Sequence, residues 1–160
     1  MTPRMISIIS WLLVLWITKI FITSLFYKFS GHPDTVYIFS TIGQWLQSAL
    51  GQSLSTAFSQ YGAYVVGTWE LITSLVLLAP AFFWLWSAIS GSTGLPQRST
   101  LHFTGGLMAS AVMAGAVFFH LASPLGVEVM HQGKPDGGSL FYAAVSILVS
   151  GIILAILNRK

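Results

Sequence analysis

The sequence predicts an all-α protein: a transmembrane four-helix bundle with an amphipathic surface helix between helices one and two. Of its 160 residues, 54% are hydrophobic and only 7% are charged, whereas soluble domains carry about 25% charged residues. Four apolar stretches reach the roughly 20 residues that cross a bilayer. A backbone in hydrocarbon must satisfy its own hydrogen bonds, which favours helices at these lengths. We expect a single transmembrane domain over residues 1–160.

The four predicted spans cover residues 5–29, 62–88, 103–122 and 139–158. The first is longer than the apolar core of a signal peptide, which has about 7–15 residues. No small-x-small cleavage site follows it. We therefore expect this stretch to be retained as a membrane anchor.

The long connection between the first two spans contains a helical pattern over residues 34–60. Apolar side chains recur there at three-to-four-residue spacing as far as Leu50. Asp34 can cap the start and Gly51 can end the run. The pattern predicts an amphipathic surface helix, continued by a shorter segment. Because it lacks a Lys/Arg face, we expect it to cap the bundle rather than bind lipid headgroups.

The basic residues divide unequally between the two sides of the predicted bundle. Lys28 and Lys134 fall on one side, and the other side holds four: Arg4, Arg98, Arg159 and Lys160. The positive-inside rule assigns the side with four to the cytoplasm. We expect both termini to be cytoplasmic, with the chain in a bacterial inner membrane. Scattered basic residues do not form a nucleic-acid patch, so the expected partner is the lipid bilayer, with no nucleic acid.

Small residues predict how the helices pack. Gly106 and Ser110 in the third span, and Gly151 and Ala155 in the fourth, recur at four-residue spacing. Such spacing lets membrane helices approach closely, so we expect tight packing of these two helices. Pro80 inside the second span predicts a kink.

Two ionisable residues lie deep in the apolar stretches: Lys19 and Glu70. Lys19 is about 13 Å from Lys28 along the first helix, and Glu70 is about 12 Å from the start of the second. The matching depths favour a Lys19–Glu70 ion pair. Nine residues turn a helix through about 900°, so Lys19 and Lys28 point in opposite directions. The pair has two interpretations, an inert structural bridge or the floor of a pocket.

Further polar residues fall near the outer ends of the helices. His120 ends the third span, Asp136 precedes the fourth and Tyr142 lies in its first turn. The simpler interpretations are a histidine bonded to a carbonyl and an aspartate that caps a helix, and these are favoured. The alternative is one outward-facing ligand-binding pocket lined by six residues: Lys19, Lys28, Glu70, His120, Asp136 and Tyr142.

The sequence contains little that predicts a metal site or an enzyme. Glu128 and His131 have a spacing that could share a metal on a helix, but the Gly- and Pro-rich loop around them argues against one. There is no cysteine, which excludes thiol chemistry. No nucleophile triad, phosphate loop or dinucleotide fingerprint is present. No enzyme class or catalytic residue follows.

Four short motifs resemble the DoxX-like family of small membrane proteins. They are residues 26–33 (FYKFSGHP), 67–71 (GTWEL), 118–126 (FFHLASPLG) and 136–141 (DGGSLF). Their order and the helix count agree over nearly the whole chain. The resemblance implies a four-helix bundle and says little about activity, because the family is named for a quinol-oxidase subunit but is diverse. Lys19 has no counterpart in these motifs. The resemblance implies a relationship between Lys28 and Glu70 instead, so either lysine can be the partner of Glu70.

Three functions compete at this level. The first is a redox-associated membrane subunit, or a protein that binds a lipophilic, quinone-like molecule in the outward-facing pocket. The second is an accessory or assembly subunit of a larger membrane complex, with purely structural charges. The third is a small transporter, for which the sequence shows neither a broken-helix pair nor an inverted repeat.

Overall fold

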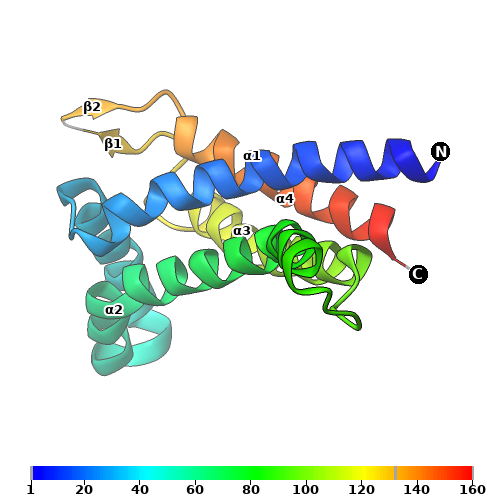
Figure 1. Ribbon diagram of the computed structural model, residues 1–160. Helices are drawn as coiled ribbons and strands as arrows, with labels where there is room; N and C mark the ends of the chain where they lie inside the picture. The colour runs from blue at the N-terminus through cyan, green and yellow to red at the C-terminus, as the bar shows by residue number, and fades with distance from the viewer. Residues whose placement is uncertain (1, 132, 160) are drawn as a thin grey trace.

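The computed structural model describes residues 2–131 and 133–159, and it is helical apart from one short hairpin of strands (Figure 1). Four helices are long and apolar enough to cross a membrane, so the predicted all-α architecture with four helices of spanning length is confirmed. The two strands pair antiparallel. The elements are α1 Pro3–Phe29, α2 Pro33–Ser90, α3 Arg98–Ala122, β1 Met130–His131, β2 Lys134–Pro135 and α4 Ser139–Asn158.

The bundle has two distinct ends (Figure 1). The terminal end carries both termini and the connection from α2 to α3. The hairpin end carries residues 33–60 and the β1–β2 hairpin. Between them lies an apolar core to which all four helices contribute: Val14, Ile17, Phe21, Leu77, Ala109, Met113, Ala144, Ile147 and Leu154.

One stripe of α1 faces the bundle. Its fully buried members are Ser10, Val14, Ile17 and Phe21, which alternate four and three residues apart. This spacing keeps side chains on one helical face. Continued by the same steps, the stripe reaches Ser24 and then Lys28, so both polar side chains point inward.

Helices α3 and α4 approach closely at their small residues, as the sequence predicts. A Cβ atom added to Gly106 would lie 2.7 Å from the Gly151 carbonyl oxygen and 3.0 Å from the Ala155 amide nitrogen. Ser110 Oγ accordingly lies 3.3 Å from the Leu148 carbonyl oxygen across the interface. Glycine is required at both contact positions because the neighbouring atoms belong to the backbone.

The structure does not support a separate amphipathic surface helix at residues 34–60. These residues belong to α2, which reverses direction at Gly51, where φ is 75° and ψ is 170°. Ser55 Oγ donates to the Gly43 carbonyl at 2.7 Å, so the two arms lie against each other as a helical hairpin. The reason is packing: apolar side chains of the first arm, such as Ile42, contact the α3–α4 loop at Leu125 and Val129.

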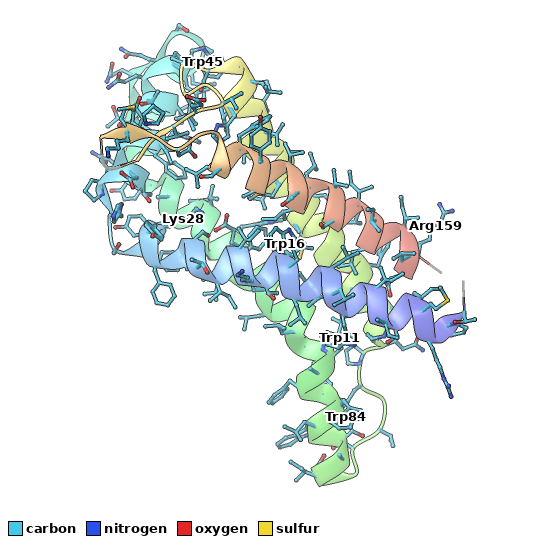
Figure 2. The ribbon with its side chains drawn as sticks, turned by 90° about the horizontal axis from the view of Figure 1, so that it is seen from above. Trp11, Trp16, Lys28, Trp45, Trp84 and Arg159 are labelled. Carbon is cyan, nitrogen blue, oxygen red and sulfur yellow. The ribbon has the colours of Figure 1, made fainter. Side chains whose placement is uncertain are left out.

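The last part of α2 leaves the bundle. Pro80 is buried inside the helix, and beyond it the segment that carries Trp84 projects away from the other helices (Figure 2). Trp84 is 74% exposed and Ile89 is 76% exposed. Proline removes one helical hydrogen bond and clashes with the preceding turn, which accounts for the change in direction.

Candidate functional site

The buried ion pair of this bundle joins α1 to α2. Lys28 Nζ donates to both carboxylate oxygens of Glu70, at 3.0 Å to Oε1 and 2.8 Å to Oε2. Ser24 Oγ lies 2.7 Å from Glu70 Oε2 and accepts a hydrogen bond from Lys28 Nζ at 3.0 Å. The three side chains form a closed triangle of charge-assisted hydrogen bonds, which are stronger than neutral ones.

The site is almost closed to the surroundings. Glu70 is 2% exposed, and the Lys28 side chain is 16% exposed. Gly67, one turn before Glu70, leaves room for α1: an added Cβ would lie 2.8 Å from Phe29 Cε1 and 3.4 Å from Lys28 Cδ. The missing side chain at Gly67 therefore lets Lys28 reach across to Glu70.

The predicted Lys19–Glu70 pair is wrong, because Lys28 is the partner of Glu70. Lys19 and Glu70 would be at the same depth only if Gly62 were level with the end of α1. In the structure Gly67 packs on Phe29, so Glu70 lies about one helical turn below the end of α1. That is the level of Ser24 and Lys28.

Lys19 points away from the bundle. It lies two residues from both Ile17 and Phe21, on the opposite face of α1, and it is exposed. Its ammonium lies 5.9 Å from the centroid of the Trp16 ring, a cation–π contact worth about 0.5–1 kcal/mol at an exposed site. A charge within a membrane span costs at least about 2.5–3.5 kcal/mol, so Trp16 alone does not compensate it.

Asp136 caps α4 and ties the β1–β2 hairpin to it. Its Oδ1 accepts from the Val129 and Gly138 amides, both at 2.9 Å. Its Oδ2 accepts from the Leu140 amide at 2.9 Å and from Ser139 Oγ at 3.0 Å. The cap that the sequence favoured is therefore present, and these bonds leave Asp136 no free carboxylate oxygen to offer a ligand.

These hydrogen bonds predict an acid-sensitive turn. Partial burial raises the pKa of Asp136, but the amide and hydroxyl donors outweigh burial and leave its pKa below the ordinary value of 3.8. A carboxyl with a depressed folded-state pKa contributes stability above its unfolded pKa and loses it as the pH falls through the folded pKa. We expect thermal unfolding in detergent to show an additional loss of stability below about pH 4 in the wild type, relative to Asp136→Asn. Parallel pH curves for the two proteins would contradict this role.

The remaining predicted site residues lie at the hairpin end, in contacts of their own. His120 Nδ1 lies 2.7 Å from the Gly126 carbonyl oxygen, so it donates there as the simpler interpretation expected. Its ring meets Phe141 edge-on, with centroids 5.6 Å apart. Tyr142 is 62% exposed. Within the described residues, neither His120 nor Tyr142 forms a hydrogen bond, ion pair or ring contact with Lys28 or Glu70.

A metal centre finds no support in the described ranges, 2–131 and 133–159. They contain no group of three or more His, Asp or Glu side chains placed to hold an ion. The side chain of His131 lies outside what the structure describes, so the sequence argument against a metal shared by Glu128 and His131 stays a prediction.

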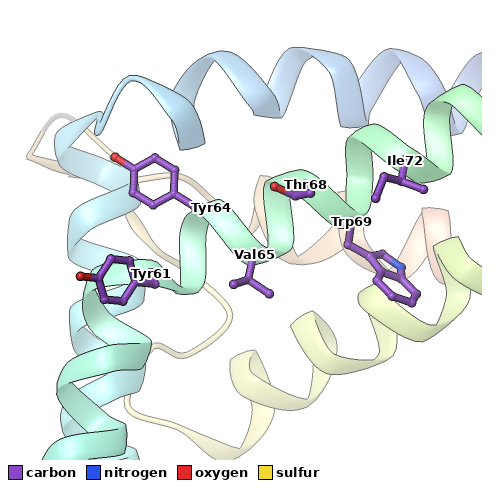
Figure 3. A pocket seen from close by; sticks show the side chains of 6 residues that line it. All are labelled: Tyr61, Tyr64, Val65, Thr68, Trp69 and Ile72. Atoms are coloured by element: carbon purple, nitrogen blue, oxygen red, sulfur yellow. The ribbon is translucent and has the colours of Figure 1, made fainter.

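A shallow apolar groove runs along α2 beside the ion pair. It is lined by six residues, Tyr61, Tyr64, Val65, Thr68, Trp69 and Ile72 (Figure 3), and encloses about 430 Å³. The Phe29 ring stacks on Tyr64 at 6.3 Å, and Trp69 Nε1 donates to the Met108 carbonyl at 3.1 Å. Thr68 and Trp69 immediately precede Glu70, but the Glu70 carboxylate does not line the groove.

The sequence analysis did not identify two polar features, the Ser24 hydroxyl and a polar cluster at the terminal end. Ser24 completes the ion-pair triangle, and its four-residue spacing from Lys28 was the available signal. At the terminal end, Asn158 Nδ2 donates to Ser10 Oγ at 2.9 Å, and Arg98 Nη1 lies 3.5 Å from both Asn158 Oδ1 and His102 Nδ1. His102 is fully buried. Its Nε2 atom forms no hydrogen bond with any described residue. The Leu77 backbone is a polar group near the ring.

The Ser24 hydroxyl has a measurable expected effect. Ser24→Ala removes one hydrogen bond to a buried carboxylate, which should lower the free energy of unfolding by about 1–2 kcal/mol. Thr23→Ala is the matched control, because Thr23 is exposed and its hydroxyl contacts only the Lys19 carbonyl at 2.8 Å. Equilibrium unfolding in mixed micelles measures the free energy of unfolding of both variants. If Ser24→Ala and Thr23→Ala lowered it equally, Ser24 would not stabilise Glu70.

Comparison with known proteins does not add an identification: no family model, curated protein or solved structure matches this chain.

Proposed function

We propose that this chain is an accessory subunit that assembles with a larger membrane protein, with its buried charges serving the fold. The proposal places it in a bacterial inner membrane with both termini in the cytoplasm. Such an orientation puts the hairpin end on the outer side and four basic residues on the inner side.

One observation carries the proposal: the side chains of Glu70, Asp136 and His120 are already bonded inside the fold. Both oxygens of Glu70 are occupied by Lys28 and Ser24, at 2% exposure. Asp136 and His120 are likewise bonded to neighbouring backbone. A ligand would have to displace these partners and bear the cost of unpairing a buried charge. Structural roles for these residues require no such displacement.

The test separates a structural ion pair from a reactive one. Lys28→Met combined with Glu70→Leu should leave a folded chain, because an apolar pair of similar size can replace a buried salt bridge. Native gels of mildly solubilised membranes should show the wild type and the double variant in the same assembly, larger than the 17.4 kDa chain. A folded double variant that loses the assembly, or a wild type that migrates without a partner, would overturn the proposal.

The groove along α2 favours a second function, the binding of a lipophilic, quinone-like molecule. Tyr61, Tyr64 and Thr68 are the polar residues of an otherwise apolar, exposed wall, and such a wall suits a lipophilic molecule that approaches from the bilayer. This site differs from the pocket that the sequence predicted, because it excludes Glu70 and His120. The resemblance to the DoxX-like family agrees with either function and rests on the short motifs alone.

Decylubiquinone is the probe for this second function. Val65→Trp should fill the groove and weaken binding to purified protein at least tenfold, while Val149→Trp, at an exposed position on α4, should not. Isothermal titration in detergent measures both variants. Equal affinities, or no saturable binding to the wild type, would reject the groove as a ligand site.

A further inference from the structure

Lys19 stands isolated on the membrane-facing side of α1. It lies about 24 Å from the Pro3 end and about 15 Å from the Phe29 end of the helix, at 1.5 Å per residue. Its neighbours on this face are exposed and mostly apolar: Leu15, Trp16, Ile22 and Phe26. The polar neighbour is Thr23, whose hydroxyl donates to the Lys19 carbonyl at 2.8 Å and carries no charge. Among the described residues, its ammonium contacts the Trp16 ring and forms no hydrogen bond or ion pair.

The side chain is too short to reach water by itself. A 27-residue helix is about 40 Å long, against a hydrocarbon core of about 30 Å, so a centred α1 places Lys19 about 10 Å below the nearer boundary. An extended lysine side chain reaches about 6 Å. Snorkelling shortens the distance to the headgroups but leaves the ammonium in the apolar region.

A second copy of this chain cannot supply the missing charge. The sequence holds four acidic residues. Glu70 is buried and paired with Lys28. Asp34, Glu128 and Asp136 all lie at the hairpin end, outside the depth of Lys19. Two copies meeting on this face would instead bring two lysines together.

We infer that the α1 face around Lys19 is the contact surface for a transmembrane helix of another protein that carries an Asp or Glu at the same depth. This inference rests on the proposed accessory role and specifies the chemistry of the partner. The carboxylate would form an ion pair with Lys19 in lipid. The aromatic and aliphatic side chains of Trp16, Ile22 and Phe26 would pack around the pair and exclude water.

A defined probe tests the charge requirement. Purified protein is reconstituted in phosphatidylcholine vesicles with leucine-rich transmembrane peptides that carry one Glu, or one Gln, about 10 Å below the outer boundary. Energy transfer between labels reports association. We expect the Glu peptide to bind the wild type about tenfold more tightly than the Gln peptide. Lys19→Gln should abolish the difference, and Lys19→Arg should retain it.

Lys134→Gln is the matched control, because Lys134 is an exposed lysine in the β-hairpin, outside the spans; it should bind like the wild type. Equal binding of the two peptides to the wild type would overturn the inference. A second overturning result combines two observations: the Glu and Gln peptides bind the wild type equally, and spin-labelled phosphatidylglycerol associates with the wild type but not with Lys19→Gln. A lipid headgroup, and not a protein carboxylate, would then cover Lys19. Self-association of the wild type that Lys19→Gln abolishes would also overturn it.

The native assembly distinguishes this inference from the proposed function. If Lys19→Gln leaves the assembly in membranes intact, the Lys19 contact is wrong and the accessory role stands. If the wild type forms no assembly at all, the accessory role is wrong whatever the peptides show. Loss of the assembly in Lys19→Gln, with a folded monomer by circular dichroism, supports both.

Discussion

Lys28→Met should be among the most destabilising single substitutions in this bundle, lowering the free energy of unfolding by about 3–5 kcal/mol. The substitution leaves Glu70 with Ser24 as its remaining side-chain partner at 2% exposure. Glu70 must then stay charged without its cation or take up a proton, and either change costs stability. Unfolding in mixed micelles followed by circular dichroism measures the loss.

Two further variants give this prediction its controls. Adding Glu70→Leu to Lys28→Met should recover most of the loss, because no uncompensated charge remains. Lys19→Met, on the exposed face of the same helix, should cost no more than about 0.5–1 kcal/mol, the strength of its contact with Trp16. If Lys28→Met and Lys19→Met were equally harmless, the ion pair would have no part in stability.

Gly151→Ala should cost about 3 kcal/mol, the upper end of the range for overpacking a close contact. The added Cβ would lie 2.7 Å from the Gly106 carbonyl oxygen and 3.1 Å from the Ser110 amide nitrogen. Both are backbone atoms of α3 that cannot rotate away, so the two helices must separate. The same unfolding experiment measures the change.

Gly115→Ala is the matched control on α3. An added Cβ at Gly115 meets no atom within 4 Å, and alanine is the better helix former by about 1 kcal/mol. We expect it to be neutral or slightly stabilising. If Gly115→Ala and Gly151→Ala lowered the free energy of unfolding equally, the effect would come from replacing glycine within a helix and not from the α3–α4 contact.

The sequence was most informative where a local pattern has one structural solution. Four apolar stretches of spanning length can hardly be anything but helices in lipid, and α1, α3 and α4 appear where hydropathy places them. The small residues of α3 and α4 predicted their close packing, because Gly106 and Gly151 offer the least bulk. Asp136 before two glycines predicted a helix cap, since a short carboxylate can reach the amides that follow it.

Two features could not be predicted in this way. Residues 34–60 carry the three-to-four-residue spacing of a surface helix, but Phe39 and Ile42 are buried after the reversal at Gly51, and Ile42 packs on Leu125 and Val129. Leu125 lies 83 residues beyond Ile42 (125 − 42). The stacking of Phe29 of α1 on Tyr64 of α2 is likewise a contact between two helices. No local periodicity encodes either contact.

The sequence by itself determined that this chain has four helices fit to cross a membrane and that its few internal charges need partners. Only the tertiary structure decided which lysine is paired. Because α1 is apolar on nearly every face, hydropathy does not show which face packs against the other helices. Depth in the membrane was then the remaining criterion, and it favoured Lys19 as the partner of Glu70. The rotation of α1 that buries Ser10, Val14, Ile17 and Phe21 brings Lys28 to Glu70 and leaves Lys19 facing outward. A helix surrounded by lipid has no preferred face until its neighbours pack against it.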